Sequence, residues 1–385
     1  MKAYKYYVPT PIFYGDGCVK KNAELLCSFG KRAFIVTSVF MSGCRNYALE
    51  DVIEIFEANG VAYAINDTVE ENPPVENVAA ITDDARKFKP DFIVGVGGGS
   101  ALDAAKAVNH LLAYPAGTDP YQAFFGGGGS LYGGGIRIDR NLPIVGIPTT
   151  AGTGSEVTAG AVLTRMDTDN KDTPPLKLYL TVAFLDAHYI EDSPSFLIHT
   201  GVMDALAHGV ECYVNTGANF MNRSIAEIGF KLFSEFKDNM LNNTLTHEDY
   251  EKMLIAANVM GMAFGQAGTT LPHGLGYPLS HYKQLNHGLS CSMTMGEYIR
   301  GFKDTSIIEN IIDLCGFKSV DEFADYVNEI LSRDVHIKVT REEIAAWTEQ
   351  FWTTQHHRLP RHPEPISKEE IHQIYLRALD RYIVD

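Results

Sequence analysis

The stretch DFIVGVGGGSALDAAK, residues 91–106, decides the fold of this chain. Its apolar start is typical of a strand buried on both faces of a parallel sheet, and the glycines lead into a segment with helical spacing. Backbone N–H groups at such a helix N-terminus attract phosphate. Gly97, Gly98 and Gly99 let an anion approach the backbone, and Ser100 can cap the helix or donate a hydroxyl. The spacing matches neither GxGxxG nor a P-loop, so phosphate binding and a turn needed only for packing both stay open.

Strand-like and helix-like segments alternate on both sides of this motif. Short β-branched runs occupy 33–37, 61–65, 91–96 and 143–147, and amphipathic segments occupy 45–59, 76–88 and 101–113. This alternation predicts βαβ units and a Rossmann-like parallel sheet. After about residue 190 the strand signal fades, and helical spacing recurs at 194–214, 220–240, 248–267, 307–316, 320–332, 340–354 and 367–382. We therefore expect an α/β dinucleotide-binding domain over residues 1–190 and an all-α metal-binding and catalytic domain over residues 191–385.

A second loop, IPTTAGTGSE at 147–156, follows the strand at 143–147. It offers Thr149 and Thr150 as hydroxyl donors. Loops that follow successive parallel strands meet at the carboxyl edge of the sheet, where ligands of doubly wound folds bind. The two loops together are therefore stronger evidence for a ligand than either loop alone. A third glycine-rich stretch, at 126–135, is expected to be a surface loop.

Composition excludes several classes of partner. The chain has 385 residues and a formal net charge of −16, which disfavours binding to nucleic acid and to anionic membranes. Its six cysteines are scattered without a CxxC pair, as expected of reduced thiols in the cytoplasm. No thiol stands out as a nucleophile. The start of the chain has no signal-like apolar segment, so we expect a cytoplasmic protein.

Histidines gather in the second half of the chain. Asp204 and His208 are four residues apart on a predicted helix, so both side chains project from one face. His273 and His287 follow in LPHGLGYPLSHYKQLNHG. One carboxylate and three imidazoles suit a divalent ion such as Fe(II) or Zn(II), with room for a substrate oxygen. The alternative is that these are core histidines with satisfied hydrogen bonds. The histidines at 356, 357 and 362 are expected to be solvated.

Four motifs together resemble one known family. The runs DFIVGVGGGSALDAAKAV, GIPTTAGTGSEVT, GVMDALAHGVECYV and HGLGYPL…NHG occur in the order and at the separations typical of the iron-dependent (group III) alcohol dehydrogenases. The resemblance covers roughly residues 5–380. It implies a dinucleotide-binding domain and a helical domain. The resemblance further implies that NAD(H) or NADP(H) meets a metal-bound alcohol or aldehyde in a cleft between them, and that hydride passes to or from the nicotinamide.

The resemblance also implies roles for particular residues. The metal ligands fall on Asp204, His208, His273 and His287. The cofactor contacts fall on Asn72, Gly97, Gly98, Gly99, Ser100, Asp103, Thr149, Thr150 and Lys177.

Two departures from the family pattern bear on function. Many relatives place an aspartate after the second strand to bind the adenosine ribose, and this chain has Ser38, so a 2′-phosphate is not repelled and NADP becomes a candidate beside NAD. Where the family usually has a histidine four residues after His273, this chain has Tyr277. The proton-handling role then passes to Tyr277 or to His281, or is absent.

Other activities stay open at this point. A glycerol dehydrogenase-like polyol oxidoreductase or a 3-dehydroquinate synthase-like lyase shares the fold and the glycine loop, but generally holds zinc with fewer side chains. A metal-dependent hydrolase uses similar ligands, but the two nucleotide loops then have no role. A homodimer is expected from base rates for soluble enzymes.

Overall fold

The computed structural model describes residues 3–39, 45–126, 141–168, 170–174 and 176–385. The chain divides into two compact units. The sheet unit contains Val8–Thr150 and Gly154–Ser193, and the helical unit contains Met1–Tyr7, Ala151–Thr153 and Pro194–Asp385. In the described parts, no helix is both long enough and apolar enough to span a bilayer.

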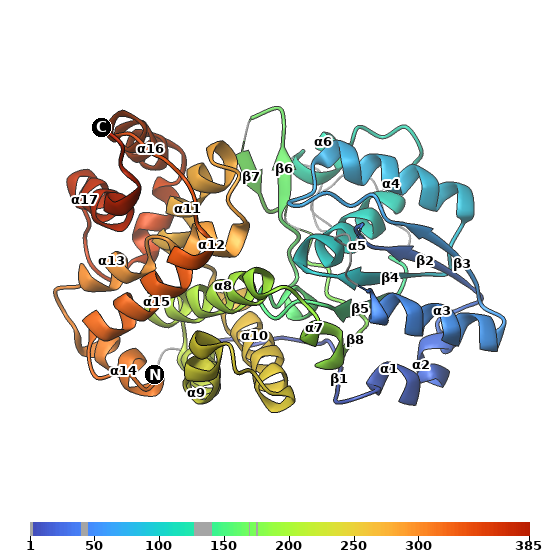
Figure 1. Cartoon of the computed structure of the whole chain (residues 1–385). Helices are drawn as coiled ribbons and strands as arrows, with labels where there is room; N and C mark the ends of the chain where they lie inside the picture. The colour runs from blue at the N-terminus through green and yellow to red at the C-terminus, as the bar shows by residue number, and fades with distance from the viewer. Residues whose placement is uncertain (1–2, 40–44, 127–140, 169, 175) are drawn as a thin grey trace. The chain divides into compact units, whose positions relative to one another are not determined.

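The sheet unit is built on a parallel sheet (Figure 1). Within the described residues it has six strands, in the order β1 (Ile12–Tyr14), β8 (Val182–Leu185), β5 (Ile144–Pro148), β4 (Phe92–Gly97), β2 (Arg32–Val36) and β3 (Ala62–Asn66). The predicted parallel α/β fold is confirmed, and the four predicted strands agree with β2, β3, β4 and β5 to within a residue. The short strands β1 and β8 were not predicted, because runs of three and four residues carry little periodicity.

Helices cover both faces of the sheet, as Figure 1 shows for α3 on one face and for α4 and α5 on the other. Ala33 and Ile35 of β2 pack in one apolar cluster, and the alternate residues Phe34 and Val36 pack in another. The first cluster includes residues of α1 (Cys18–Lys21), α2 (Ala23–Ser28), α3 (Tyr47–Asn59) and α7 (His188–Glu191). The second includes residues of α4 (Val75–Phe88), α5 (Gly99–Leu112) and α6 (Pro120–Phe125). Burial on both faces explains why the central strands read as continuous apolar runs.

An antiparallel pair, β6 (Leu163–Arg165) and β7 (Asn170–Asp172), lies in the same unit and was not predicted. Most of the glycine-rich stretch at 126–135 lies outside the described residues.

The helical unit contains α8 (Ser195–Val214), α9 (Phe220–Asn242), α10 (His247–Ala267), α11 (Leu271–Tyr282), α12 (His287–Ser292), α13 (Met295–Arg300), α14 (Ser306–Leu314), α15 (Val320–Asp334), α16 (Arg341–Thr354) and α17 (Lys368–Leu379). The predicted all-α second half is confirmed. Helix α8 contacts α9, α10, α11, α12 and α15, and nearly all of its residues are buried, as expected of a central helix that is apolar all round.

Helices α11 to α13 were not predicted as helices. Pro278 lies inside α11, where proline removes a backbone donor and disfavours helix, and the glycines lower helical propensity further. Packing of α11 against α8, α12 and α16 outweighs these local preferences.

The expectation for the C-terminal histidines was wrong at one position. His356 and His357 are exposed, but His362 is buried, and its Nδ1 lies 3.0 Å from the hydroxyl of Tyr298. The ring also packs edge-on against Phe302. A loop rich in proline and arginine therefore holds a core histidine.

Candidate functional site

Helix α8 carries the first two candidate ligands. Asp204 and His208 are one helical turn apart, and only 2% and 5% of their surfaces are exposed. Phe264 of α10 stacks on His208 with ring centroids 3.9 Å apart and planes 5° from parallel. The stacking fixes the imidazole ring, so that its Nε2 lies 3.9 Å from Asp204 Oδ1.

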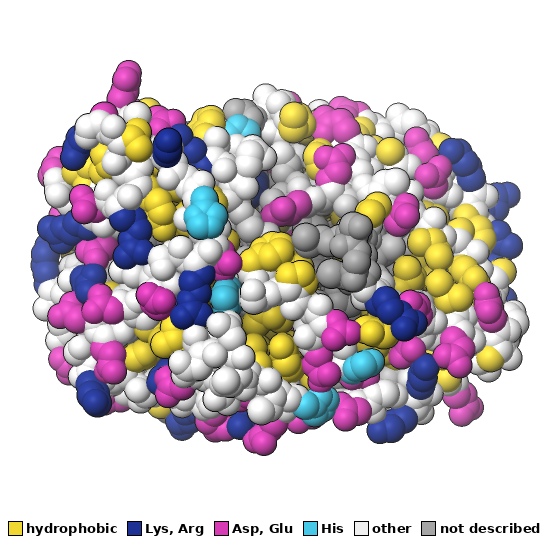
Figure 2. Space-filling model, in the orientation of Figure 1, with side chains coloured by type: hydrophobic (Ala, Val, Ile, Leu, Met, Phe, Trp, Pro, Cys, Tyr) yellow, Lys and Arg dark blue, Asp and Glu magenta, His cyan; other side chains and the backbone are white. Residues whose placement is uncertain are grey.

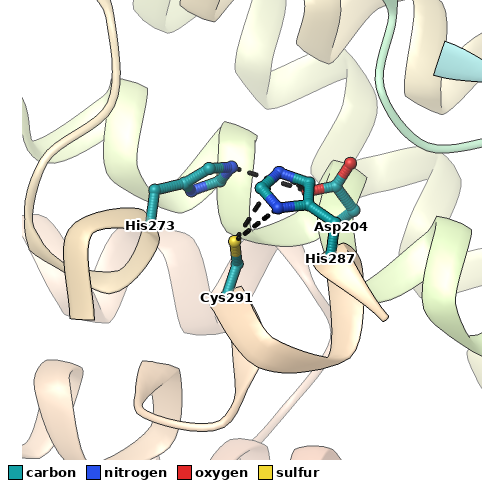
Figure 3. A group of neighbouring side chains, drawn as sticks. All are labelled: Asp204, His273, His287 and Cys291. Atoms are coloured by element: carbon teal, nitrogen blue, oxygen red, sulfur yellow. Dashed lines mark hydrogen bonds and ion pairs between the residues drawn. The ribbon is translucent and has the colours of Figure 1, made fainter. Parts of the chain in front are cut away.

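His273 and His287 complete the predicted set. They lie on the first turns of α11 and α12. Their Nε2 atoms lie 3.5 Å and 3.9 Å from Asp204 Oδ1, and the Nε2 atoms of His208 and His273 are 2.9 Å apart. Figure 3 shows Asp204, His273 and His287 converging from three segments of the chain. The structure therefore brings all four residues around one carboxylate oxygen.

The arrangement fits a divalent metal ion. Among the described residues, Asp204 Oδ1 is buried and has no hydrogen-bond donor, although burying a carboxylate oxygen without compensation is costly. Ligand atoms bound to one Zn(II) ion at about 2.0–2.2 Å lie roughly 3–4 Å from one another. The distances from Asp204 Oδ1 fall in this range, and nitrogen and oxygen donors suit Fe(II) and Zn(II).

Glu211 orients His273 and was not identified from the sequence. This fully buried carboxylate accepts hydrogen bonds from His273 Nδ1 and, at 2.7 Å, from the backbone N–H of Thr270. The bond at Nδ1 leaves the lone pair of Nε2 for a metal ion, which is the usual arrangement around ligating histidines. The signal in the sequence was the position of Glu211, three residues after His208 on the same helix.

The charges of Asp204 and His208 suit ligand chemistry, whereas the pKa of His273, which burial lowers, is held above its ordinary value by Cys291 and Glu211. Burial raises the pKa of Asp204, but His208, His273 and His287 outweigh it and hold this pKa below its ordinary value. Burial lowers the pKa of His208 to about 4, so its ring is neutral near pH 7. A carboxylate and a neutral imidazole are the forms that bind metals.

Cys291 also lies in the centre, although no thiol stood out in the sequence. It is one turn after His287 on α12, and its Sγ lies 3.6 Å from Nδ1 and 3.7 Å from Nε2 of that ring. Burial raises the pKa of Cys291, but the charges of His273 and His287 lower it to about 6. Its spacing from His287, as i and i+4, was the signal in the sequence.

The two proton-relay candidates lie further along α11. Tyr277 is one turn beyond His273, about 6 Å along the axis, and His281 is two turns beyond it. The Tyr277 hydroxyl accepts a hydrogen bond of 2.9 Å from the buried Arg358, a residue that was not singled out from the sequence. The backbone carbonyl of His281 accepts a hydrogen bond from Gln284.

The predicted glycine loop lies in the sheet unit, at the end of β4. Gly97 has a φ of +148°, and a Cβ there would lie 2.8 Å from the Cβ of Ala101, so a larger residue is strained. Gly98 precedes α5, and Gly99 begins that helix; in the described structure no side chain caps it. Uncapped N–H groups at a helix N-terminus are suited to binding an anion.

The second loop lies beside the first. The backbone N–H of Thr149 donates to the carbonyl of Gly97 at 3.0 Å, and a Cβ on Gly98 would lie 3.2 Å from the Thr150 side chain. Ser100 Oγ accepts a hydrogen bond from the N–H of Asn72, whose φ is +50°. These predicted cofactor residues therefore lie together at the carboxyl edge of the sheet.

The carboxylate of Asp103 is bound by other residues of the sheet unit. One carboxylate oxygen accepts a hydrogen bond from Ser155 and pairs with the buried Lys106 at 3.4 Å. The other oxygen accepts from the N–H of Val162 at 2.8 Å. These bonds join α5 to the chain that follows the second loop, so Asp103 positions the two loops relative to each other.

Ser38 and Lys177 are less enclosed. Ser38 is partly buried just after β2 and forms a bridge with Thr68. Lys177 is exposed, with a φ of +51°, in the segment before β8.

Two parts of the chain match the sequence patterns of one protein family. Residues 9–187 match "Iron-containing alcohol dehydrogenase", and residues 197–379 match "Fe-containing alcohol dehydrogenase family, C-terminal". The NAD-dependent methanol dehydrogenase of Bacillus methanolicus is 31% identical over 295 residues, covering 75% of this chain and 74% of that protein. The sulfoacetaldehyde reductase of Bilophila wadsworthia (strain 3_1_6) is 27% identical over 392 residues, covering 96% and 97%.

A solved structure agrees with these matches. An iron-containing alcohol dehydrogenase from Thermotoga maritima superimposes with a TM-score of 0.84 and 30% identity, over 98% of this chain and 100% of that one. The chain belongs to the iron-containing alcohol dehydrogenase family, as the sequence motifs indicated, and is an enzyme of the oxidoreductase class.

Proposed function

We propose that this protein interconverts a small alcohol and its aldehyde, with a divalent metal ion and NADP(H) or NAD(H) as cofactors. The observation that carries the proposal is the convergence of Asp204 and three imidazoles on one buried oxygen, in a chain that also carries a glycine loop. We assign metal binding and catalysis to residues 191–385 and dinucleotide binding to residues 1–190.

Asp204, His208, His273 and His287 would hold Fe(II), or Zn(II) in its place. When bound, the ion supplies Lewis-acid activation of the substrate oxygen, and the nicotinamide supplies or accepts the hydride. Asp204, His208 and His273 are buried, which limits the access of water to the charges around Asp204, whereas the side chain of His287 is 23% exposed. Glu211 holds the His273 ring in place for this role.

The cofactor would bind at the carboxyl edge of the sheet. The N–H groups of Gly98, Gly99 and Ser100 would hold the diphosphate, since they lie at the start of α5. Gly97 keeps the turn open, and Thr149 and Thr150 would add hydroxyl contacts. Asn72, Asp103 and Lys177 complete the set of residues that we propose to bind the cofactor.

One proton must be exchanged with solvent for each turnover. The hydroxyl of Tyr277 would carry it, because it lies one turn beyond His273 and accepts a hydrogen bond from Arg358. His281, one turn further on, is the second candidate. Tyr277→Phe should then lower kcat and change its pH profile while metal content stays the same. If the pH profile of kcat changes in His281→Gln and not in Tyr277→Phe, the relay is assigned to His281.

We predict that NADPH is used at least as well as NADH. Ser38 places no negative charge at the end of β2, where a carboxylate would repel a 2′-phosphate. Ser38→Asp should therefore raise KM for NADPH and leave KM for NADH nearly unchanged. Steady-state kinetics with both cofactors test this, and a clear preference of the wild-type enzyme for NADH would contradict it.

The main test is an absorbance assay with nicotinamide cofactor and a panel of short alcohols, diols, hydroxy acids and aldehydes. We expect metal-dependent oxidation of the reduced cofactor by at least one aldehyde, lost on chelation and restored by Fe(II) or Zn(II). A lyase or a hydrolase would convert its substrate without changing the absorbance of the nicotinamide cofactor. If no member of the panel changes that absorbance in the metal-loaded protein, the proposed function is wrong.

We further propose that the enzyme is a cytoplasmic homodimer with no nucleic-acid or membrane partner. Scattered cysteines and the net charge of −16 support this location and these exclusions. The five described cysteines are free thiols. Sedimentation at several concentrations would test the dimer.

A further inference from the structure

Helix α12 presents two side chains with metal-binding atoms. His287 and Cys291 are one turn apart and lie on the same face. Ligand atoms of Asp204, His273, His287 and Cys291 all lie within 4.8 Å of one another. Figure 3 shows the sulfur pointing toward the His287 ring, on the side where the other side chains converge.

The size of this cluster is close to that of a metal site. Two atoms bound to one Zn(II) ion are separated by at most the sum of their bond lengths, about 4.4 Å for nitrogen and sulfur. A contraction of roughly 0.4 Å or less would therefore bring each pair that includes the sulfur into range.

The thiol is not committed to a single hydrogen bond. Its Sγ is almost equally far from both nitrogens of the His287 ring, at 3.6 Å and 3.7 Å, which does not fit one linear S–H···N bond. Cys291 is also fully buried, so water does not compete for the sulfur. A buried sulfur facing imidazoles and a carboxylate is well placed to bind a cation.

Another cysteine serves as a comparison within the same unit. Cys212 is four residues after His208, is fully buried and lies on α8. It is nevertheless not part of the cluster that the described residues form. Spacing from a histidine is therefore not sufficient, and the position of α12 against α8 and α11 is what places Cys291 in the centre.

We propose that Cys291 is a thiolate ligand of the metal ion, in addition to the four ligands assigned above; its sulfur clusters with the ligand atoms of Asp204, His273 and His287. This inference rests on the proposed metal-dependent function. On binding, the sulfur–metal bond forms, the thiol proton is released to solvent, and no electrons are exchanged. The thiolate and the Asp204 carboxylate then balance the charge of a divalent ion in a buried site. Because thiolate is a soft ligand, it favours Zn(II) over Fe(II) more than a site with only nitrogen and oxygen donors does.

The test uses the full-length protein loaded with Co(II) without oxygen. A thiolate ligand produces a sulfur-to-cobalt charge-transfer band in the near ultraviolet, besides the visible ligand-field bands. We expect this band in the wild-type protein and in the matched control Cys212→Ser, and its loss in Cys291→Ser. X-ray absorption of the wild-type protein loaded with Zn(II) should show a sulfur neighbour at about 2.3 Å, and this measurement requires no variant.

A competition experiment tests the selectivity. When equal amounts of Fe(II) and Zn(II) are offered, Cys291→Ser should take up a larger share of iron than the wild-type protein. The role of Cys291 would be overturned, with the metal centre left intact, by two results for the wild-type protein. Its Co(II) spectrum would show ligand-field bands but no charge-transfer band, and its X-ray absorption would show no sulfur neighbour of Zn(II). If neither Co(II) nor Zn(II) binds, both the role of Cys291 and the proposed function are wrong.

Discussion

At the scale of single residues, the proposed metal centre depends on a few buried polar groups. Asp204 lies in the middle of this centre. Glu211 accepts a hydrogen bond from Nδ1 of His273, on the side of the ring away from the candidate ion. Such outer contacts fix the tautomer of a ligating histidine and raise its affinity for the metal. Asp204 and Glu211 thus have different roles, although both are buried carboxylates on α8.

Glu211→Gln should weaken metal binding about 10- to 100-fold, because a neutral amide orients His273 less strongly than a carboxylate does. Competition with a metal-binding dye measures this affinity. Glu227→Gln on α9 is the control, since Glu227 accepts from the Tyr213 hydroxyl and does not contact the histidines of the centre in the described structure. Equal affinities of wild type and Glu211→Gln would show that Glu211 is not needed to position His273.

The residues of the site were largely predictable, and its surroundings were not. Asp204, His208, His273 and His287 follow from residue types and motif spacing. Glu211, Cys291 and Arg358 were missed, because only the packing of helices distant in sequence shows which side of a helix faces the centre. His362 was assigned to solvent because its neighbours are polar and proline-rich, whereas contact with Tyr298 and Phe302 buries it.

At the scale of elements, the turn from β4 into α5 is tightly constrained. The φ of +148° at Gly97 is rare for residues with a side chain, and the added Cβ would meet Ala101. The sheet around this turn was predictable, because strands buried on both faces read as apolar runs. Helix α11 was not, because its proline and glycines conceal a helix that tertiary contacts stabilise.

Gly97→Ala should weaken binding of the nicotinamide cofactor by about ten-fold or more, since relieving a strain of order 1–3 kcal/mol shifts the N–H groups of the loop. Fluorescence titration with NADPH measures the Kd. Gly60→Ala is the control, because Gly60 also has a positive φ, of +63°, but ends α3 with open space around it. We expect the control to lower stability only; an unchanged Kd in Gly97→Ala would contradict the assignment of this loop.

The loop that holds His362 should make stability depend on pH. Burial lowers the pKa of His362 from its ordinary value of 6.5 to about 4, so between these pH values the unfolded chain binds a proton that the folded chain does not. The free energy of unfolding should fall as pH falls through this window, by at most about 3 kcal/mol.

Urea unfolding at several pH values, with chelator present so that metal release does not contribute, would measure this dependence. His362→Gln keeps a polar group beside Tyr298 but does not titrate, so its stability should fall less between pH 6.5 and 4. Identical pH dependence in both proteins would contradict the assignment.

At the scale of the whole molecule, the charge pattern agrees with a small-molecule enzyme. On the face shown in Figure 2, acidic and basic side chains are intermixed and do not gather into one basic patch. A phosphate-bearing cofactor does not need such a patch, because the amides at the start of α5 suffice. The net charge of −16 is thus compatible with binding a dinucleotide.

Removal of the metal should destabilise the folded protein. An ion that binds only the folded state adds about 2.7 kcal/mol of stability at a free concentration of 100 times its Kd. Chelation should therefore lower the Tm of the wild-type protein and leave the Tm of Asp204→Asn nearly unchanged. Differential scanning calorimetry compares the two, and equal shifts would show that the chelated ion binds elsewhere.

The central claim is that Asp204 and the three histidines bind a metal ion. Anomalous scattering at the iron and zinc edges, from crystals of protein purified without oxygen, tests it most directly. We expect one strong peak within bonding distance of Asp204 Oδ1 and of the Nε2 atoms of His208, His273 and His287. A metal-containing, active protein whose only peak lies away from Asp204 would contradict the claim.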